Sequence, residues 1–318
     1  MSDRPLILIC YDLLVPLKAR LEASGYEVAF SWEMTPEQAG RAQAILHAGE
    51  YRLTPEFLNG LPRLGLIANV SAGYDGIDVP WCVSRGIGVT HSDGLNADDV
   101  ADHAMGLLIG SWRNIVAGDR AVREDRWNNG ARLTPGPGLK GRKLGIMGLG
   151  HIGVAVAVRA QAFGMVVSWW GPNPKPDQPW PRADSLLTLA QASDILVVAC
   201  RADKSNQGAV SVEVIEAVGP GGLIVNVSRG SVINEDGLIA ALRAGTLGRA
   251  ALDVFAQEPT PPQRWADVPN VVLTPHSAGG TTNSLPLMIG QAFENLRCHY
   301  AGEPLASPVA ESVAVNLT

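Results

Sequence analysis

The sequence predicts an α/β protein of two doubly wound domains, each built on a parallel sheet. Short apolar runs alternate with helix-like segments along most of the chain. The 318 residues exceed what one typical core requires and are enough for two domains. A glycine-rich turn at residues 148–153 follows one apolar run and precedes a segment of small residues. This arrangement is typical of a nucleotide-binding strand, turn and helix.

Composition narrows the class of protein. Apolar residues make up 46% and charged residues 18%, which is ordinary for a globular protein. The formal net charge of −6 gives no support to nucleic-acid binding. The 4 cysteines form no C-x-x-C and predict free thiols in a reducing compartment. The N-terminus lacks the apolar core of a signal peptide, and no apolar run could span a bilayer, so we expect a cytoplasmic protein without a membrane partner.

The first predicted domain begins with a repeating strand and helix pattern. Its apolar runs predict strands at Pro5–Tyr11, Glu27–Phe30, Ala42–His47, Leu64–Val70 and Gly86–Thr90. Thr54 and Pro55 predict the start of a helix, because threonine caps a helix and proline fits its first turn. From Asn96 onward, acids followed by apolar residues at helical spacing predict a long helix that crosses between the domains.

The second predicted domain is organised around the glycine turn. Its apolar runs predict strands at Leu144–Met147, Val166–Trp170, Ile195–Ala199, Leu223–Val227, Arg249–Val254 and Val271–Leu273. Glycine and proline predict loops at Gly130–Gly141 and Pro172–Pro181. Thr281–Tyr300 predicts a helix that returns to the first domain, and we expect an irregular tail from Gly302.

Gly148, Gly150 and Gly153 have the spacing of a dinucleotide site. The first glycine would make a tight turn, the second would let a pyrophosphate approach the backbone, and the third would let helix and strand pack closely. The following helix would present free N–H groups to the phosphates. A strand, turn and helix without a ligand remains the alternative.

Three side chains that follow successive strands predict a catalytic site. Arg229 can bind a carboxylate with two parallel hydrogen bonds. A pair of His276 and Glu258 would raise the pKa of the imidazole and suit it to acid-base chemistry near neutral pH. A surface salt bridge and a structural histidine are the alternatives for each residue taken singly. The other histidines lack ligand spacing, so we expect no metal.

Together these motifs resemble the D-isomer-specific 2-hydroxyacid dehydrogenase family, and within it glyoxylate/hydroxypyruvate reductases. The matching segments are Gly148–Gly153, Asn226–Ile233, Gly237–Glu258 and Thr274–His276. The resemblance implies a Rossmann cofactor domain at residues 98–283, inserted in a flavodoxin-like substrate domain at residues 1–97 and 284–318. It also implies a homodimer built through the cofactor domain.

The resemblance also implies a role for each matching residue. Arg229 would bind the carboxylate and carbonyl of the substrate, His276 would exchange the proton, and Glu258 would hold His276 and keep its pKa high. Asp253 would contact the nicotinamide carboxamide. The other expected substrate contacts are Leu53, Val70, Ser71, Ala72 and Gly73. The expected cofactor contacts are Gly148, Leu149, Gly150, His151, Ile152, Gly153, Trp170, Gly171, Asn173, Lys175, Cys200, Arg201, Val227, Ser228, Arg229, Asp253, His276 and Ala278.

Two departures from the family pattern concern the cofactor. Gly171 stands where members that prefer NAD carry an acid for the ribose 2′-OH. Losing that carboxylate removes repulsion against a 2′-phosphate, which Asn173 and Lys175 could contact. Arg201 replaces the usual proline and adds a cation. We therefore expect NADP(H) to be preferred, with NAD(H) possible.

The leading functional hypothesis is an enzyme that reduces small 2-keto acids, such as glyoxylate and hydroxypyruvate, to D-2-hydroxy acids with NADPH. A second hypothesis is another activity of the family, such as an NAD-linked dehydrogenase of another D-2-hydroxy acid like phosphoglycerate, or phosphite oxidation. Phosphoglycerate would require extra cations near the substrate loop, for which Arg52 is a candidate. A third is a dinucleotide-sensing binding protein of the corepressor type.

Overall fold

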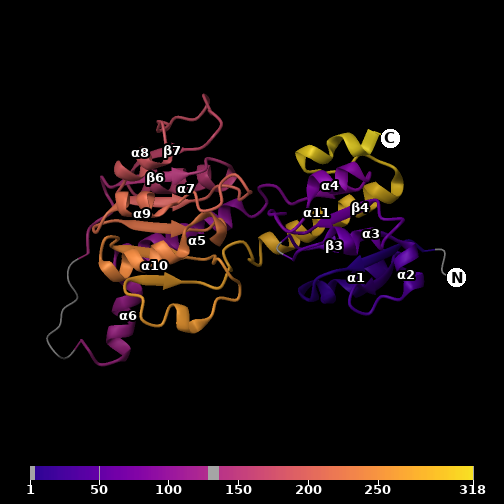
Figure 1. The fold of residues 1–318 in the computed structure, drawn as a ribbon, viewed down its shortest axis with the longest axis horizontal. Helices are drawn as coiled ribbons and strands as arrows, with labels where there is room; N and C mark the ends of the chain where they lie inside the picture. The colour runs from indigo at the N-terminus through magenta and orange to yellow at the C-terminus, as the bar shows by residue number, and fades with distance from the viewer. Residues whose placement is uncertain (1–3, 50, 128–135, 318) are drawn as a thin grey trace. The chain divides into compact units, whose positions relative to one another are not determined.

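The computed structural model describes residues 4–49, 51–127 and 136–317. The chain forms two compact units (Figure 1). Unit 1 comprises Met1–Asn96 and Thr282–Thr318, and unit 2 comprises Ala97–Thr281. The expected domain boundaries fall within two residues of these. Part of the loop expected at residues 130–141 lies outside the described residues.

Unit 1 is built on a five-stranded parallel sheet in the order β2-β1-β3-β4-β5, which is the flavodoxin-like order. The strands are β1 (Leu6–Ile9), β2 (Glu27–Phe30), β3 (Ala42–His47), β4 (Leu66–Asn69) and β5 (Gly88–Thr90). The helices are η1 (Asp12–Leu17), α1 (Lys18–Ala23), α2 (Pro36–Arg41), α3 (Pro55–Asn59), α4 (Val79–Ser84), α11 (Ser284–Ala301) and η4 (Ala310–Leu317).

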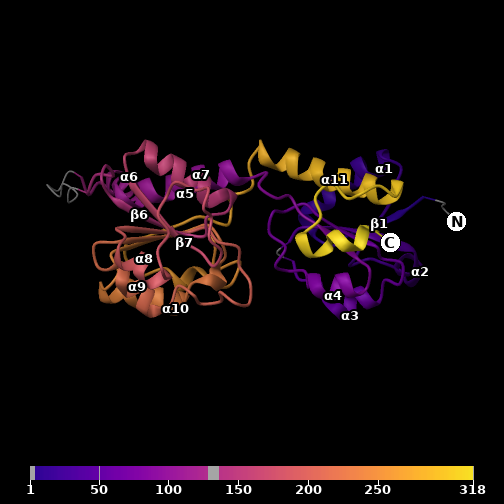
Figure 2. The same cartoon turned by 90° about the horizontal axis from the view of Figure 1, so that it is seen from above.

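The helices of unit 1 cover both faces of its sheet. Figure 2 shows α1 and α11 on one face, and α3 and α4 on the other. Alternate strand residues face each layer, so that Ile7 and Leu66 pack toward α11 whereas Leu8 and Ile67 pack toward α3 and α4. The expected strands and their parallel arrangement are therefore confirmed.

The C-terminal tail is more regular than the sequence predicted. Residues after Gly302 include the 3₁₀ helix η4, which packs beside β5. Val89 N–H donates to Ser312 Oγ at 3.1 Å, and Val309 N–H donates to the carbonyl of Val89 at 2.9 Å. The tail thus satisfies backbone groups of an edge strand, a long-range pairing that local composition does not reveal.

Unit 2 is built on a six-stranded parallel sheet in the order β11-β10-β9-β8-β6-β7. The strands are β6 (Lys143–Met147), β7 (Val166–Trp170), β8 (Ile195–Val198), β9 (Leu223–Asn226), β10 (Arg249–Leu252) and β11 (Val271–Leu273). The helices are α5 (Ala97–Trp112), α6 (Ile115–Arg123), α7 (His151–Ala162), α8 (Leu186–Gln191), α9 (Val212–Val218), η2 (Gly230–Val232), α10 (Glu235–Ala244) and η3 (Pro262–Arg264).

The strand order of unit 2 reverses at β6, with β7 on one side and β8 on the other. Open α/β sheets bind ligands at the carboxyl ends of their strands beside such a reversal. Figure 2 shows α5 and α7 on one face of this sheet, and α8, α9 and α10 on the other. The sheet is therefore covered on both faces, as its largely apolar strands require.

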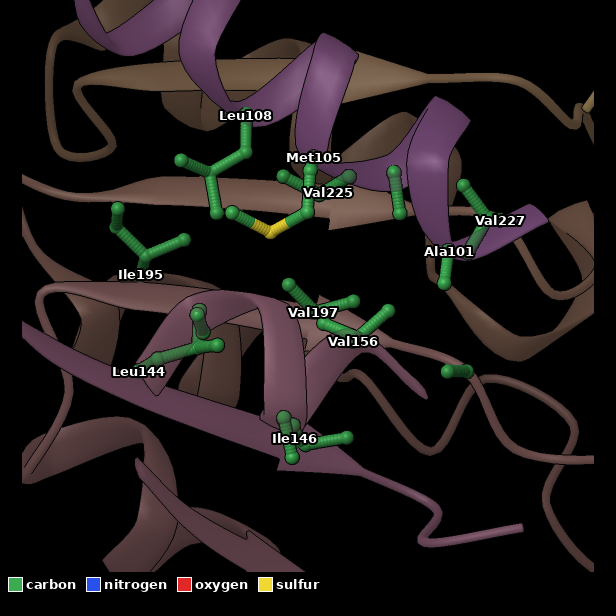
Figure 3. Packing of buried hydrophobic residues seen from close by; sticks show 14 of the residues in the cluster. Ala101, Met105, Leu108, Leu144, Ile146, Val156, Ile195, Val197, Val225 and Val227 are labelled. Carbon is green, nitrogen blue, oxygen red and sulfur yellow. The ribbon is translucent and has the colours of Figure 1, made fainter. Parts of the chain in front are cut away.

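Helix α5 is packed firmly on the strands of unit 2. Figure 3 shows Met105 and Leu108 of this helix against Val197 and Val225. Burying one such side chain stabilises a fold by roughly 1.5–3 kcal/mol. Polar residues on the same helix are thereby held at defined positions over the sheet. Within the described ranges, no helix has both the length and the apolar composition needed to cross a bilayer.

Candidate active site

At each of the three glycines in the turn after β6, a different steric condition favours the absence of a side chain. Gly148 has φ +92°, and a Cβ there would lie 2.4 Å from Cys200 Cα. A Cβ on Gly153 would lie 2.1 Å from the carbonyl oxygen of Gly148. Gly150 has no heavy atom within 4 Å of its ideal Cβ, so this part of the backbone is open to a ligand. The first and third glycines serve the turn and its packing, while the second leaves room for an approaching group.

The glycine turn also presents N–H groups. Helix α7 starts at His151, and its N-cap residue Gly150 provides no side-chain cap. Within the described part of the chain, the N–H groups of Gly150 and Ile152 donate to no protein acceptor. Free N–H groups at the positive end of a helix dipole match the chemistry of a pyrophosphate. These residues therefore fit the phosphates of a dinucleotide.

In dinucleotide-binding domains, residues at the end of the strand that corresponds to β7 select between a ribose 2′-OH and a 2′-phosphate. Gly171 is buried there, and both Asn173 and Lys175 are exposed in the loop that follows. Arg182 returns to the same place, where Nε and Nη2 donate to the carbonyl of Gly171 at 3.1 and 2.8 Å. A guanidinium therefore lies at the strand end where the sequence alone placed only one lysine.

The loop after β8 forms the other side of the turn. Asn206 Nδ2 donates to the carbonyl of Arg201 at 2.7 Å, which holds this loop. Ser228 Oγ donates to the carbonyl of Cys200 at 2.5 Å and links the loops after β8 and β9. The Arg201 side chain is exposed. Cys200, Arg201 and Ser228 thus lie together at one sheet edge.

The three residues expected to do chemistry follow three neighbouring strands, β9, β10 and β11. Arg229, Glu258 and His276 therefore emerge at the same edge of the sheet, because parallel strands share their carboxyl ends. The backbones of the first two loops touch closely: a Cβ on Gly230 would lie 1.8 Å from the carbonyl carbon of Phe255. Only glycine allows this approach, which brings Arg229 beside the loop that ends at Glu258.

His276 and Glu258 form a close pair. His276 Nδ1 lies 2.6 Å from Glu258 Oε2, and 23% and 30% of their side chains are exposed. The other carboxylate oxygen accepts a hydrogen bond from Phe255 N–H at 2.8 Å. Burial alone would raise the pKa of Glu258, but hydrogen bonds from His276 and Phe255 and the charges of His276 and Arg229 outweigh it and lower this pKa. Glu258 is thus an ionised acceptor that orients the imidazole.

The turn that carries His276 (residues 274–278, the His276 turn) is anchored on Asp253. His276 has φ +49°, a conformation that a non-glycine residue adopts only when its surroundings hold it there. Its N–H donates to the backbone carbonyl of Asp253 at 2.8 Å. The Asp253 carboxylate, 1% exposed, accepts hydrogen bonds from the N–H groups of Ser277 and Ala278, each at 3.0 Å.

The expected substrate loop (residues 70–73) follows β4 within unit 1. Asn69 Nδ2 donates to the carbonyls of Ser71 and Gly73 at 2.9 and 2.8 Å, and His91 Nδ1 lies 3.2 Å from the carbonyl of Ala72. With the carbonyls engaged, the N–H groups of Ala72 and Gly73 have no protein acceptor among the described residues. This geometry suits a carboxylate ligand.

Leu53 and Val70 are placed differently from the rest of the expected substrate contacts. Their side chains are 3% and 5% exposed and belong to the core of unit 1. Leu53 pairs through its backbone with Ile77. Either residue could therefore meet a ligand mainly through backbone atoms.

Sequence reasoning missed several residues that support the site. Asn69 holds the substrate loop, Arg182 reaches Gly171, and Thr274 donates to Asp253 Oδ1 at 2.6 Å. Asn69 could have been noticed, because it ends a strand that runs directly into the loop. Nothing local marks Arg182, and the Thr274–His276 match gave Thr274 no role of its own, since each side chain acts across a fold contact. In the described ranges, no group of 3 or more metal-ligating side chains is present.

The chain is similar in sequence to known proteins. A family model described as D-isomer specific 2-hydroxyacid dehydrogenase, NAD binding domain, matches residues 105–278. A glyoxylate/hydroxypyruvate reductase of Arabidopsis thaliana is 39% identical, with 86% of this chain and 85% of the relative covered. A hydroxyphenylpyruvate reductase of Plectranthus scutellarioides is 38% identical, with 86% and 87% covered.

Solved structures show the same architecture. The crystal structure of an NADPH-dependent glyoxylate/hydroxypyruvate reductase from Sinorhizobium meliloti, in complex with NADP and malonate, superposes with a TM-score of 0.90. It is 31% identical and covers 98% of each chain. The chain therefore belongs to the D-isomer-specific 2-hydroxyacid dehydrogenase family of NAD(P)-dependent oxidoreductases.

Proposed function

We propose that this enzyme reduces small 2-keto acids, such as glyoxylate and hydroxypyruvate, to D-2-hydroxy acids with NADPH. The observation that carries the proposal is the placement of Arg229 beside the His276–Glu258 pair on three adjacent strand ends. The Arg229 guanidinium can bind the carboxylate of a 2-keto acid, and the oriented His276 imidazole can give a proton to its carbonyl oxygen. The similarity to glyoxylate/hydroxypyruvate reductases supports the choice of substrate.

In the proposed mechanism, a nicotinamide dinucleotide held by the glycine turn of residues 148–153 would supply a hydride to the carbonyl carbon. Arg229 binds the substrate carboxylate and polarises the carbonyl. The carbonyl π electrons move to oxygen, which takes a proton from Nε2 of the His276 imidazolium. Glu258, hydrogen-bonded to Nδ1 at 2.6 Å, orients the ring and stabilises its cationic form. Neutral His276 remains and regains a proton from solvent before the next reduction.

We assign substrate positioning to the loop of residues 70–73 in unit 1. Its unbonded N–H groups at Ala72 and Gly73 would receive the substrate carboxylate. Asp253 lies at the strand end where the nicotinamide carboxamide is expected, although its own carboxylate already holds the His276 turn. It therefore serves as an anchor as well as a candidate cofactor contact.

A steady-state assay tests the proposed reaction. Loss of NADPH absorbance is followed with glyoxylate, hydroxypyruvate, pyruvate and an aromatic 2-keto acid, and the product is resolved on a chiral column. We expect turnover with the small acids and a D product. His276→Ala and Arg229→Ala should each reduce kcat/KM by at least about 10²-fold. Near wild-type turnover in either variant would contradict the site.

Larger 2-keto acids are a second candidate substrate class. The similarity to a hydroxyphenylpyruvate reductase favours them, because it is nearly as high as the similarity to the glyoxylate/hydroxypyruvate reductase. The small side chains of Ser71 and Ala72 would leave room for a larger group. The aromatic acid in the assay decides between the classes through the ratio of kcat/KM values.

The proposal includes a preference for NADPH over NADH. Gly171 provides no carboxylate against a 2′-phosphate, and the guanidinium of Arg182, together with Lys175, adds positive charge at the same strand end. Equilibrium titration of NADP⁺ and NAD⁺ against tryptophan fluorescence measures the preference. Gly171→Asp should weaken NADP⁺ more than NAD⁺ by about tenfold, because the new carboxylate repels phosphate. Equal or tighter binding of NAD⁺ to the wild type would refute the preference.

We also propose a cytoplasmic homodimer that pairs through unit 2. All four cysteines are free thiols, as in a reducing compartment. Helix α6 exposes Ile115, Val116 and Val122, which are 55%, 42% and 59% accessible, and this apolar surface suits a second copy. Light scattering should give twice the monomer mass, and Ile115→Lys with Val122→Lys should give monomers.

A further inference from the structure

His103 lies on α5, far in sequence from the strand ends of the site, yet it contacts the base of the His276 turn. Its Nε2 lies 2.9 Å from Thr274 Oγ1 and 3.4 Å from Asp253 Oδ1. The imidazole is 26% exposed, while the Asp253 side chain is 1% exposed. The side chains of His103, Thr274 and Asp253 therefore form one cluster (the His103 cluster). Its carboxylate is buried, and its imidazole is partly exposed to solvent.

Hydrogen-bond donors and acceptors assign a direction to this cluster. The Asp253 carboxylate already accepts the N–H groups of Ser277 and Ala278, so both of its oxygens act as acceptors. The Thr274 hydroxyl, 2.6 Å from Oδ1, must therefore donate its one hydrogen to Asp253. The lone pairs of Thr274 Oγ1 remain, so His103 must be the donor at 2.9 Å. This requires a hydrogen on Nε2.

The cluster bears on His276 because both partners of His103 belong to its support. Thr274 begins the His276 turn, and Asp253 holds the turn through its carboxylate and its backbone carbonyl. His276 has φ +49°, so the turn depends on these contacts to keep its conformation. A loss of order here would move the imidazole relative to Glu258.

We propose that His103 is a positioning residue, whose Nε2–H acts through the Thr274 hydroxyl and the Asp253 carboxylate to hold the turn that carries His276. This rests on the catalytic role proposed for His276. His103 acts on the His276 imidazole only through Thr274 and Asp253. Helix α5 is suited to this task, because its apolar face is packed on the sheet (Figure 3). This packing fixes the helix from which His103 extends.

The test compares a substitution that removes the N–H donor of His103 with one that supplies another N–H donor. His103→Leu introduces an apolar side chain of similar size and high helix propensity, and His103→Gln places an amide N–H at a similar reach. We expect His103→Leu to lower kcat about tenfold while KM changes by less than about twofold, since the ring is displaced and substrate binding is spared. His103→Gln should restore most of the loss.

A double-mutant cycle with Thr274→Val checks the route. If His103 acts through Thr274, then His103→Leu should change kcat by less than about twofold in the Thr274→Val background. Asp102→Asn is the matched control: it lies one residue earlier on α5 and pairs with Arg159 of α7 at 2.6 Å. It should leave kcat unchanged. Thermal unfolding of every variant verifies that each one folds.

Ring ¹⁵N chemical shifts of His276, measured by histidine-selective labelling, report the turn without turnover. They should move in His103→Leu and return in His103→Gln. Wild-type kcat and unmoved shifts in His103→Leu, or additive effects in the cycle, would overturn the inference. Turnover that survives in His276→Gln would instead refute the proposed function, and the shifts would still decide whether His103 positions the turn.

Discussion

Glu258 carries the most direct electrostatic consequence at the residue scale. The pKa of its carboxyl lies below the ordinary 4.5, so it contributes stability that is present above pH 4.5 and is lost as pH falls through the lowered pKa. We expect the difference in unfolding free energy between wild type and Glu258→Gln to shrink as pH falls below 4.5. Urea unfolding across this range measures it. A difference that persists at the lowest pH would show that the charge of Glu258 is not what stabilises.

The glycine turn allows a second prediction at the residue scale, from a matched pair of substitutions. Gly153→Ala places a Cβ 2.1 Å from the carbonyl of Gly148 and should destabilise unit 2 by roughly 1–3 kcal/mol. Gly150→Ala meets no protein atom within 4 Å and should preserve stability, yet it should weaken NADP⁺ binding because a methyl group enters the space left for phosphate. Denaturant titration and fluorescence titration separate the effects. Equal effects of the two variants on both measurements would contradict this division.

At the scale of elements, helix α10 supports the loop that ends at Glu258. Glu235, 7% exposed at the start of this helix, accepts the N–H of Ala256 at 2.8 Å and pairs with Arg264. Glu235→Gln should cost about 1–3 kcal/mol, because it weakens a buried hydrogen-bonded pair. Asp236→Asn is the control, since Asp236 is 87% exposed and also pairs with Arg264. It should cost less than about 1 kcal/mol. Comparable costs in chemical denaturation would show that burial of Glu235 has no role.

The sheet of unit 1 contains a buried histidine at the end of β3. His47 is 0% exposed, and burial lowers its pKa from 6.5 to about 4. The unfolded chain therefore binds a proton that the folded unit rejects, and stability is lost as pH falls from 6.5 toward 4, by roughly 3 kcal/mol in total. His47→Gln should show a smaller loss over this window. An identical pH dependence in the variant would rule out His47 as its source.

At the scale of the whole molecule, each unit has hydrophobic core clusters of its own, so we expect a ligand of one unit to stabilise mainly that unit. The glycine turn and the strand ends that fit a dinucleotide all belong to unit 2. NADP⁺ at about 100 times its Kd should add about 2.7 kcal/mol to the unfolding of that unit. In calorimetry, the unfolding transition of unit 2 should move to a higher temperature when NADP⁺ is added, while the transition temperature of unit 1 should not change. A single transition that moves as a whole would show that the units unfold together.

Local patterns in the chain were sufficient for much of this protein. Strands at the predicted positions, the glycine turn and the three strand-end residues are visible in sequence, because apolar runs, glycine spacing and parallel order are properties of short segments. The steric reasons for Gly148 and Gly153 agree with the spacing that predicted them. Parallel strands share their carboxyl ends, which is why Arg229, Glu258 and His276 could be grouped before the fold was known.

Contacts between distant residues were decided only in three dimensions. His103 meets Thr274 across 171 positions, and Arg182 reaches Gly171 across 11. The regular helix η4 pairs with β5 across 223 positions, where an irregular tail was expected. Such pairings depend on packing and on the need of each buried polar group for one partner. Hydrophobic periodicity predicts which face of an element is buried, but it does not predict which distant polar group will be its hydrogen-bond partner.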